Sequence, residues 1–265
     1  MGELVFVGLG LYDEAGISLK GLEEVKSADA VFLELYTSLM PGFSMNRLTS
    51  LSGKNPQILS RRMIEDENGE VLLRAAETGK AVLLVPGDPM IATTHIALRL
   101  EAEKRGIKTR IVHAASIVSA AIGLSGLHNY KFGKSVTIPF PDNFSETPYN
   151  VIAENKERGL HTLCLLDINA EEKRYLTINE ALNLLLSVEE KRRKGVVTSQ
   201  TIAVGVARAG SQNPTVKAGT IETLIKYDFG SPPYTLIFPG KLHFMEAEAL
   251  ILLAKAPENI RGLSK

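Results

Sequence analysis

Asp88 is the side chain whose position in this sequence most suggests chemistry. It lies in the turn Pro86-Gly87-Asp88-Pro89, which directly follows the purely apolar run Ala81–Val85. Such a run predicts a buried strand, and open α/β sheets bind their ligands just outside the carboxyl ends of their strands. A carboxylate at this place either caps the next helix or accepts hydrogen bonds from a ligand. The turn is therefore a candidate ligand-binding loop.

A second glycine loop of the same kind follows the first strand. Leu4–Val7 runs into Gly8-Leu9-Gly10, and Asp13 comes shortly afterwards. Glycine lets the chain turn sharply and lets a ligand approach the backbone closely. The loop lacks the third glycine of a dinucleotide fingerprint, and Glu34 is the nearest candidate for a ribose anchor. Either loop alone could be an ordinary turn, but together they favour a small-molecule site made of backbone and carboxylate.

The histidines and the cysteine do not have the spacing of a metal site. No two histidines are three or four residues apart, and no cysteines cluster beside them. His95 could face a pocket near Asp88, although helix surface or core is the commoner place for a lone histidine. Cys164 lies inside an apolar run, where a small buried hydrophobe is expected rather than a nucleophile. We expect no bound metal and assign no catalytic residue.

The loop Ala207–Pro214 follows another predicted strand and carries Arg208. Its small residues would let a flat ring lie against the backbone, and Arg208 would place positive charge near the opening. A plain hairpin turn fits the same residues equally well. Ser231–Tyr234 and Pro239–His243 enter and leave the last predicted strand and read equally well as ordinary turns.

Strands and helices alternate along the first part of the chain. The apolar runs predict strands at 4–7, 30–35, 81–85 and 110–112, and the helical patterns lie after Ser18 and at 70–78 and 94–105. This alternation predicts a mainly parallel sheet covered on both faces. We expect residues 1–113 to form an N-terminal α/β domain that carries both glycine loops.

Residues 114–265 are expected to form a second α/β domain, with a mixed sheet. After a small-residue helix at 117–124, strands are predicted at 135–138, 162–166, 201–206, 215–218 and 234–238. Helices around 151–158, 178–193 and 244–253 separate some of these strands, whereas others follow one another directly. Directly connected strands pair antiparallel, so this sheet cannot be wholly parallel.

Composition excludes several classes of protein. In 265 residues, 30 lysines and arginines balance 30 aspartates and glutamates, so no basic surface for nucleic acid is expected. No apolar stretch approaches the roughly 20 residues of a membrane helix. The N-terminus has no basic segment before an apolar run and shows no export signal. With its single cysteine, the chain is expected to be a cytoplasmic protein in a reducing compartment.

The motifs, in their order along the chain, resemble the diphthine synthase family of the tetrapyrrole methylase superfamily. The two glycine loops are typical of the whole superfamily, and the resemblance covers essentially the whole chain. Three segments narrow it to the family: Tyr36-Thr37-Ser38, Lys131-Phe132-Gly133-Lys134-Ser135 and Gly159-Leu160-His161-Thr162. Other matching segments are Val7–Leu11, Pro86–Pro89, Ala92–His95, Leu166–Ile168, Ala207–Ser211 and Pro239–His243.

The resemblance implies S-adenosylmethionine in a cleft between two α/β domains, S-adenosylhomocysteine as product, and a homodimer. It implies repeated methylation of the amino group of the aminocarboxypropyl-modified histidine of translation elongation factor 2. The cofactor contacts carried over by position are Leu11, Asp88, Ile91, Ser116, Ile117, Leu166, Ala209 and Tyr234. At Tyr234 the family often has histidine, which a backbone contact would tolerate. Candidate partners for the substrate carboxylate are Lys131, Lys134, Arg174, Arg208 and Lys241.

Two alternatives from other classes remain open. The same fold can methylate a tetrapyrrole or corrin ring, which predicts turnover of such a ring and none of the elongation factor. A non-catalytic sensor of an adenosyl ligand predicts tight binding without methyl transfer. The segments that match the family favour the elongation factor over a ring substrate.

Overall fold

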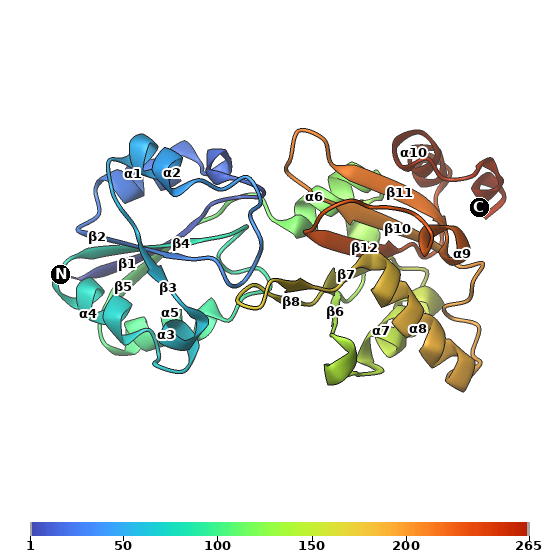
Figure 1. Ribbon diagram of the computed structural model, residues 1–265, viewed down its shortest axis with the longest axis horizontal. Helices are drawn as coiled ribbons and strands as arrows, with labels where there is room; N and C mark the ends of the chain where they lie inside the picture. The colour runs from blue at the N-terminus through green and yellow to red at the C-terminus, as the bar shows by residue number, and fades with distance from the viewer. Residues whose placement is uncertain (1, 264–265) are drawn as a thin grey trace. The chain divides into compact units, whose positions relative to one another are not determined.

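The computed structural model describes residues 2–263 of the chain, which fold into two compact units. The first unit runs to Ser116 and includes Ala170–Glu172. The second unit comprises Ile117–Asn169 and the chain from Lys173 onward. Figure 1 shows the elements of both units, each of which is described by itself below. This division follows Ser116, whereas the first domain is expected from the sequence to end at residue 113.

The first unit is built on a wholly parallel sheet of five strands. In the order β3-β2-β4-β1-β5, these are Gln57–Leu59, Ala30–Glu34, Lys80–Val85, Glu3–Gly8 and Lys108–Val112. Every pairing among them is parallel, with Gly8 opposite Val85 and Leu33 opposite Leu84. The predicted parallel sheet is confirmed, and the carboxyl ends of β2, β4, β1 and β5 lie along one edge.

Helices cover both faces of this sheet (Figure 1). They are α1 Leu19–Lys26, α2 Met45–Ser52, α3 Arg61–Glu65, α4 Glu70–Thr78 and α5 His95–Lys104. Strand β1 feeds two cores, because Val5 and Val7 pack with α1 and α2 whereas Leu4 and Phe6 pack with α4 and α5. Helix α1 begins where predicted, because the Ser18 hydroxyl accepts a hydrogen bond from the Gly21 amide. After β1 the chain continues to α1 on one face of the sheet, and after β4 it continues to α5 on the other face (Figure 1). Sheets of this kind bind ligands at the point where neighbouring strands lead to opposite faces.

The second unit contains a mixed sheet, as predicted. In the order β11-β10-β12-β7-β6, its strands are Thr215–Thr220, Ile202–Ala207, Tyr234–Phe238, Thr162–Leu166 and Val136–Ile138. Only the β6–β7 pairing is parallel. A small hairpin follows β7, formed by β8 Ile168–Asn169 and β9 Arg174–Tyr175. This hairpin was not predicted from the sequence.

Two helical layers enclose the second sheet. The larger helices are α6 Ile117–Ser125, α7 Thr147–Glu157, α8 Ile178–Arg192 and α10 Phe244–Ala254, with a short α9 at Ile221–Leu224. Tyr149 of α7 and Leu182 of α8 pack on one face, and Ala121 of α6 and Leu250 of α10 pack on the other. Within residues 2–263, no helix is long and apolar enough to cross a membrane.

Candidate functional site

The two glycine loops meet at the carboxyl edge of the first sheet. The Gly10 amide donates to the Gly87 carbonyl at 3.2 Å, and the Gly87 amide donates to the Gly10 carbonyl at 2.7 Å. Both glycines have left-handed φ values, 75° for Gly10 and 70° for Gly87, which are strained for other residues. The two loops that sequence reasoning combined into one site are therefore joined through their backbones.

Gly8 is required because there is no room for a side chain at the end of β1. A Cβ atom there would lie 2.5 Å from the Gly87 carbonyl oxygen and 2.7 Å from the Ala114 Cβ. By contrast, a Cβ on Gly87 would meet no atom within 4 Å. The edge is thus tightly packed at Gly8 and open beside Gly87, where a ligand can approach the backbone.

Asp88 is buried and holds this edge together. Its Oδ1 accepts a hydrogen bond from the Met90 amide at 3.0 Å. Its Oδ2 accepts from the Ala114 amide at 3.3 Å and lies 2.8 Å from His113 Nδ1. Asp88 therefore ties the loop after β4 to the end of β5. A carboxylate oxygen can accept two hydrogen bonds, so Oδ1 retains capacity for a ligand donor.

Backbone strain accompanies these loops. Tyr12 and Ala92 are not glycines, yet their φ values are 72° and 57°. Left-handed backbone at such residues costs on the order of 1–3 kcal/mol and tends to collect at functional sites. Both residues lie in loops at the carboxyl edge, one after β1 and one after β4. The strain supports this edge as the functional part of the first unit.

Glu34 does not have the role of a ribose anchor. It is fully buried at the end of β2, and its carboxylate accepts hydrogen bonds from the Tyr36 and Thr37 amides and the Thr37 hydroxyl. His95 Nε2 lies 3.1 Å from the same carboxylate. His95 is itself fully buried, so it belongs to the core rather than facing a pocket.

The second sheet brings three predicted cofactor residues to one edge. Strand β10 ends where β12 begins, with Ala207 opposite Tyr234. Strand β7 ends beside the same part of β12, with Leu165 opposite Thr235. The predicted residues that share this edge are Leu166, Ala209 and Tyr234.

The other predicted cofactor residues lie near the connection of the units or in the first unit. Ser116 is buried and directly precedes α6, which begins at Ile117. Ile91 is 44% exposed on the turn that follows Asp88, and Leu11 is half-buried in the loop after β1.

Arg208 follows β10 at the same edge as Tyr234, and its guanidinium is occupied by the protein. Nη1 donates to the carbonyls of Phe229 and Ser231 at 2.8 and 2.9 Å, and Nη2 donates to the Thr215 hydroxyl. Arg208 also has a left-handed φ of 54°. It thus orders the segment that leads into β12, besides being a candidate for substrate binding.

Arg174 lies in β9, beyond the end of β7. Its two Nη atoms donate to the Asp142 carboxylate at 2.8 and 2.6 Å, and its guanidinium lies 4.0 Å from the centre of the Phe140 ring. These hydrogen bonds lower the pKa of Asp142 to about 2. The pair is exposed to solvent, so an anionic ligand can compete with Asp142 for the arginine.

The three lysine candidates lie at the opposite edge of the second sheet, near the start of β7 and the end of β12. Lys131 and Lys134 precede β6, and Lys241 follows the end of β12. Leu166 lies at the far end of β7, Thr162–Leu166, which spans about 13 Å at about 3.3 Å per residue. The structure therefore places Lys131, Lys134 and Lys241 away from the edge that carries the predicted cofactor residues of this unit.

Glu246 is the centre of a buried polar cluster at this opposite edge. It is fully buried, and its carboxylate accepts hydrogen bonds from the amides of His128 and His243 at 2.9 and 2.8 Å. His161 Nε2 lies 2.8 Å away, and the Lys131 ammonium forms an ion pair with it. Lys131 also donates to the Lys241 carbonyl at 2.6 Å.

This cluster, which we call the Glu246 cluster, joins three of the segments on which the family resemblance rests. His161 accepts from the Gly240 amide on Nδ1 at 2.9 Å, so its Nε2 carries the hydrogen that Glu246 accepts. Burial lowers the pKa of His161 despite the neighbouring carboxylate, which keeps the imidazole neutral. Sequence reasoning missed Glu246, although its spacing from His243 at the start of α10 is that of a capping box.

Neither a metal site nor a reactive thiol is present in the described part of the chain. No group of three or more His, Cys, Asp or Glu side chains could hold an ion there. Cys164 is completely buried, and burial raises the pKa of its thiol. It is the small buried hydrophobe that its sequence context predicts.

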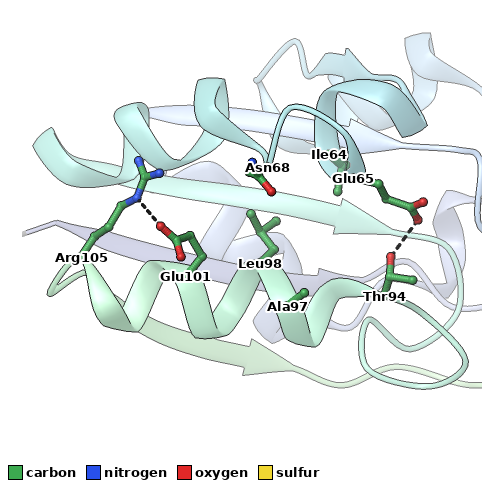
Figure 2. Close-up of a pocket in the computed structure, with 8 residues that line it drawn as sticks. All are labelled: Ile64, Glu65, Asn68, Thr94, Ala97, Leu98, Glu101 and Arg105. Carbon is green, nitrogen blue, oxygen red and sulfur yellow. Dashed lines mark hydrogen bonds and ion pairs between the residues drawn. The ribbon is translucent and has the colours of Figure 1, made fainter.

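A groove of about 450 Å³ lies between α3 and α5 in the first unit (Figure 2). Its lining residues are Ile64, Glu65, Asn68, Thr94, Ala97, Leu98, Glu101 and Arg105. Its charged groups are already paired, because Glu65 forms an ion pair with Arg61 at 2.7 Å and Glu101 with Arg105 at 3.0 Å. Glu65 also accepts a hydrogen bond from Thr94 at 2.8 Å. None of the predicted cofactor residues lines this groove.

Comparisons with known proteins agree on one family. A family model for tetrapyrrole (corrin/porphyrin) methylases matches residues 3–225. A diphthine synthase of Methanosarcina mazei is 51% identical over 264 residues, which cover 97% of this chain and 98% of that protein. A diphthine synthase of Methanocaldococcus jannaschii is 48% identical over 256 residues, covering 95% and 99%. A crystal structure of a diphthine synthase superposes with a TM-score of 0.90 at 45% identity, covering 98% of this chain and 99% of that one.

Proposed function

The chain belongs to the tetrapyrrole methylase family and is a methyltransferase, and on that premise we propose its substrate and its cofactor contacts. It transfers methyl groups from S-adenosylmethionine to the amino group of the aminocarboxypropyl-modified histidine of translation elongation factor 2. The observation that carries this proposal is the identity of about one half, over nearly the whole of both chains, to diphthine synthases. The relatives described above are named diphthine synthases, which favours the protein substrate.

The residues proposed to hold the cofactor form one set in each unit. The first set is Leu11, Asp88, Ile91 and Ser116, and the second is Ile117, Leu166, Ala209 and Tyr234. The backbone beside Gly87 is open to approach, and the residues around it are mostly small or apolar. This suits an adenosyl group bound mainly through main-chain hydrogen bonds. When bound, S-adenosylmethionine supplies an electrophilic methyl group on sulfur.

The chain's own contribution to the reaction is positioning. Methyl transfer is an in-line displacement, and correct alignment of the reacting groups can supply about 7–11 kcal/mol of the barrier. The incoming amine must be unprotonated, but an α-amino group has a pKa near about 8. A useful fraction is therefore reactive at neutral pH without a dedicated base. The rigid, hydrogen-bonded loops after β1 and β4 are suited to hold the reactants in place.

For the substrate carboxylate we propose Arg174 or Arg208 as the partner. Both lie in the part of the second unit where Leu166 and Tyr234 are found, whereas Lys131, Lys134 and Lys241 lie at the other edge. Arg174 would exchange its exposed pair with Asp142 for the substrate. Because Arg208 orders the segment before β12, replacing it would also disturb the cofactor contact at Tyr234.

We propose that the protein acts as a homodimer in the cytoplasm, where its substrate works in translation. Exposed apolar side chains on α10 support self-association: Phe244, Met245, Leu252 and Leu253. Large apolar patches on a protein surface commonly mark interaction sites. Sedimentation equilibrium is expected to give twice the mass of the 265-residue chain, and replacement of Leu252 and Leu253 by lysine is expected to shift it towards the monomer. A wild-type protein that stays monomeric at micromolar concentration would exclude the dimer.

The proposed reaction is tested with labelled S-adenosylmethionine and elongation factor 2 that already carries the aminocarboxypropyl histidine. Mass added to that histidine in steps of one methyl group is the expected result. Unmodified elongation factor and a uroporphyrinogen serve as parallel substrates. Transfer to the ring alone would replace the proposal by ring methylation. Tight cofactor binding with no transfer to any of them would indicate a sensor.

A further inference from the structure

A turn at the end of β2 is held more rigidly than a surface connection requires. Glu34 is fully buried, and three of its hydrogen bonds come from the next residues of the chain: the amides of Tyr36 and Thr37, at 2.9 and 3.1 Å, and the Thr37 hydroxyl. The fourth is with His95 Nε2 at 3.1 Å. A carboxylate offers about four acceptor positions, so Glu34 is saturated by this turn and by His95.

His95 is the first residue of α5 and connects the turn to this helix. Because an ionised carboxylate only accepts hydrogen bonds, His95 Nε2 carries the hydrogen of this contact. Within residues 2–263, no group forms a hydrogen bond with His95 Nδ1, although the ring is fully buried. The ring of Tyr36 lies edge-on to His95, and its hydroxyl is buried near the side chain of Thr94.

This arrangement costs more free energy than closing a turn requires. Burying a carboxylate and an imidazole removes both from water, and an unpartnered buried polar atom carries a further penalty. No lysine or arginine among the described residues forms an ion pair with Glu34. The segment that follows the turn also contacts the loop after β1, since the Gly42 amide donates to the Tyr12 carbonyl at 3.0 Å. The Glu34–His95 pair is thus best explained by a need for an accurately placed turn.

The turn lies beside the loops proposed to hold the cofactor. Strand β2 is the direct neighbour of β4, and β4 of β1, so the carboxyl ends of the three strands follow one another along the edge. The loops after β4 and β1 are assigned to the cofactor by position, whereas the end of β2 has no assigned role. Ser38 follows the rigid part of the turn and is half-buried.

We propose that Ser38 binds the amino-acid head group of the protein substrate, and that Glu34 and His95 are positioning residues for it. This inference rests on the proposed function, because it assigns part of the same reaction's substrate site. A serine hydroxyl donates to a carboxylate and accepts from an ammonium group, and the modified histidine carries both. Its position after β2 places Ser38 at the same edge of the sheet as the loops proposed to hold the cofactor.

The inference is tested by comparing four variants in the full-length protein. Ser38→Ala removes the hydroxyl, and His95→Leu removes the hydrogen bond to Glu34. His95→Gln keeps an amide donor near the position of Nε2. Ser50→Ala is the matched control for Ser38→Ala, because Ser50 is an exposed serine on α2 of the same unit, and its hydroxyl donates to the Asn46 carbonyl. For each variant we would measure kcat and KM with modified elongation factor 2, the Kd for S-adenosylhomocysteine, and Tm.

For Ser38→Ala we expect KM for the protein substrate to rise about ten- to a hundredfold, as for a lost hydrogen bond to a charged group. The cofactor Kd should change less than about threefold, and Tm should remain as in Ser50→Ala. For His95→Leu we expect a similar or larger loss of kcat/KM, partly restored in His95→Gln.

Two results would overturn the inference. An unchanged KM in Ser38→Ala would exclude a substrate contact, even if His95→Leu failed to fold. Equal loss of cofactor binding and methylation in His95→Leu would assign the pair to the cofactor loops instead. If the wild-type protein itself did not methylate elongation factor 2, the proposed function would fail first, and this outcome is distinguishable from the other two.

Discussion

Replacing Glu246 with glutamine is expected to destabilise the second unit by about 3–5 kcal/mol, the usual loss when one member of a buried ion pair is removed. The carboxylate accepts hydrogen bonds from two backbone amides, from His161 and from the Lys131 ammonium. Glutamine has nearly the same shape, but it carries no charge and turns one acceptor into a donor. The Lys131 ammonium would then lose its counter-charge, and at least one amide would lose its acceptor.

The loss of protein stability at acidic pH is expected to depend on the Glu246 cluster. Burial alone would raise the pKa of Glu246, but the hydrogen bonds from His243, Lys131, His128 and His161 lower it from 4.5 to about 2. A lowered folded-state pKa adds stability above the unfolded-state value, and this stability is lost as the pH falls. The contribution of Glu246 should therefore be complete above pH 4.5 and disappear towards pH 2. In Glu246→Gln this part of the acid dependence should be missing.

The control for this prediction is Glu248→Gln on the same helix. Glu248 is partly exposed and pairs with Arg261 at the surface, so its loss should cost less than about 1 kcal/mol. Urea denaturation would give the difference in stability, and hydrogen exchange would place it in the segments 128–134, 159–166 and 239–246. Equal stability of the two variants would contradict a central role for Glu246.

The regular elements of this fold were largely predictable from the sequence, because buried strands are nearly continuous apolar runs. Strands β7 and β12 have the predicted bounds, Thr162–Leu166 and Tyr234–Phe238. Helix α4 also agrees, at Glu70–Thr78. Helix α7 begins earlier than predicted, because the apolar pattern becomes clear only at Val151.

The elements that were missed are short and carry a weak apolar pattern. Strand β3 has three residues, of which Gln57 and Ile58 are exposed, because it lies at the edge of the sheet. The hairpin of β8 and β9 has two residues in each strand. Such segments are fixed by pairing with distant parts of the chain, and local sequence does not encode those partners.

The candidate site was predictable where strand direction alone decides the position of a loop. In a parallel sheet all strands end at one edge, so the loops at Gly10 and Asp88 had to lie on the same edge. The pairing of β1 with β4 then makes them neighbours. In the mixed second sheet the direction of each strand must be known first. Lys131, Lys241 and Arg208 were named together as basic candidates for the substrate carboxylate, and the structure places the two lysines at the other end of the strands.

The roles of buried polar side chains were the least predictable part. Asp88 was expected either to cap a helix or to bind a ligand, and its carboxylate also links two strand ends, which the sequence did not indicate. Glu34 has the position of a ribose anchor along the sequence, but it is saturated by its own turn and by His95. Such hydrogen bonds depend on atomic positions that only the folded chain defines.

Replacing Gly8 with alanine is expected to weaken the binding of S-adenosylhomocysteine at least about a hundredfold. The added Cβ would lie 2.5 Å from the Gly87 carbonyl oxygen on one side and 2.7 Å from the Ala114 Cβ on the other. These atoms follow β4 and β5, which are the two strands that pair with β1. Neither neighbour can move away without disturbing its pairing with β1, so the loops that carry Leu11 and Asp88 must shift.

A hundredfold loss of affinity corresponds to about 2.7 kcal/mol, which is within the 1–3 kcal/mol that overpacking commonly costs. The control is Gly123→Ala in α6, where the new Cβ meets no atom within 4 Å. Alanine is favoured over glycine inside a helix by about 0.5–1 kcal/mol, so this variant should be slightly more stable and bind the ligand normally. Isothermal titration calorimetry of both variants decides the matter. Unchanged affinity in Gly8→Ala would mean that the cofactor is not held by the joined glycine loops, because no substitution at this edge disturbs their geometry more directly.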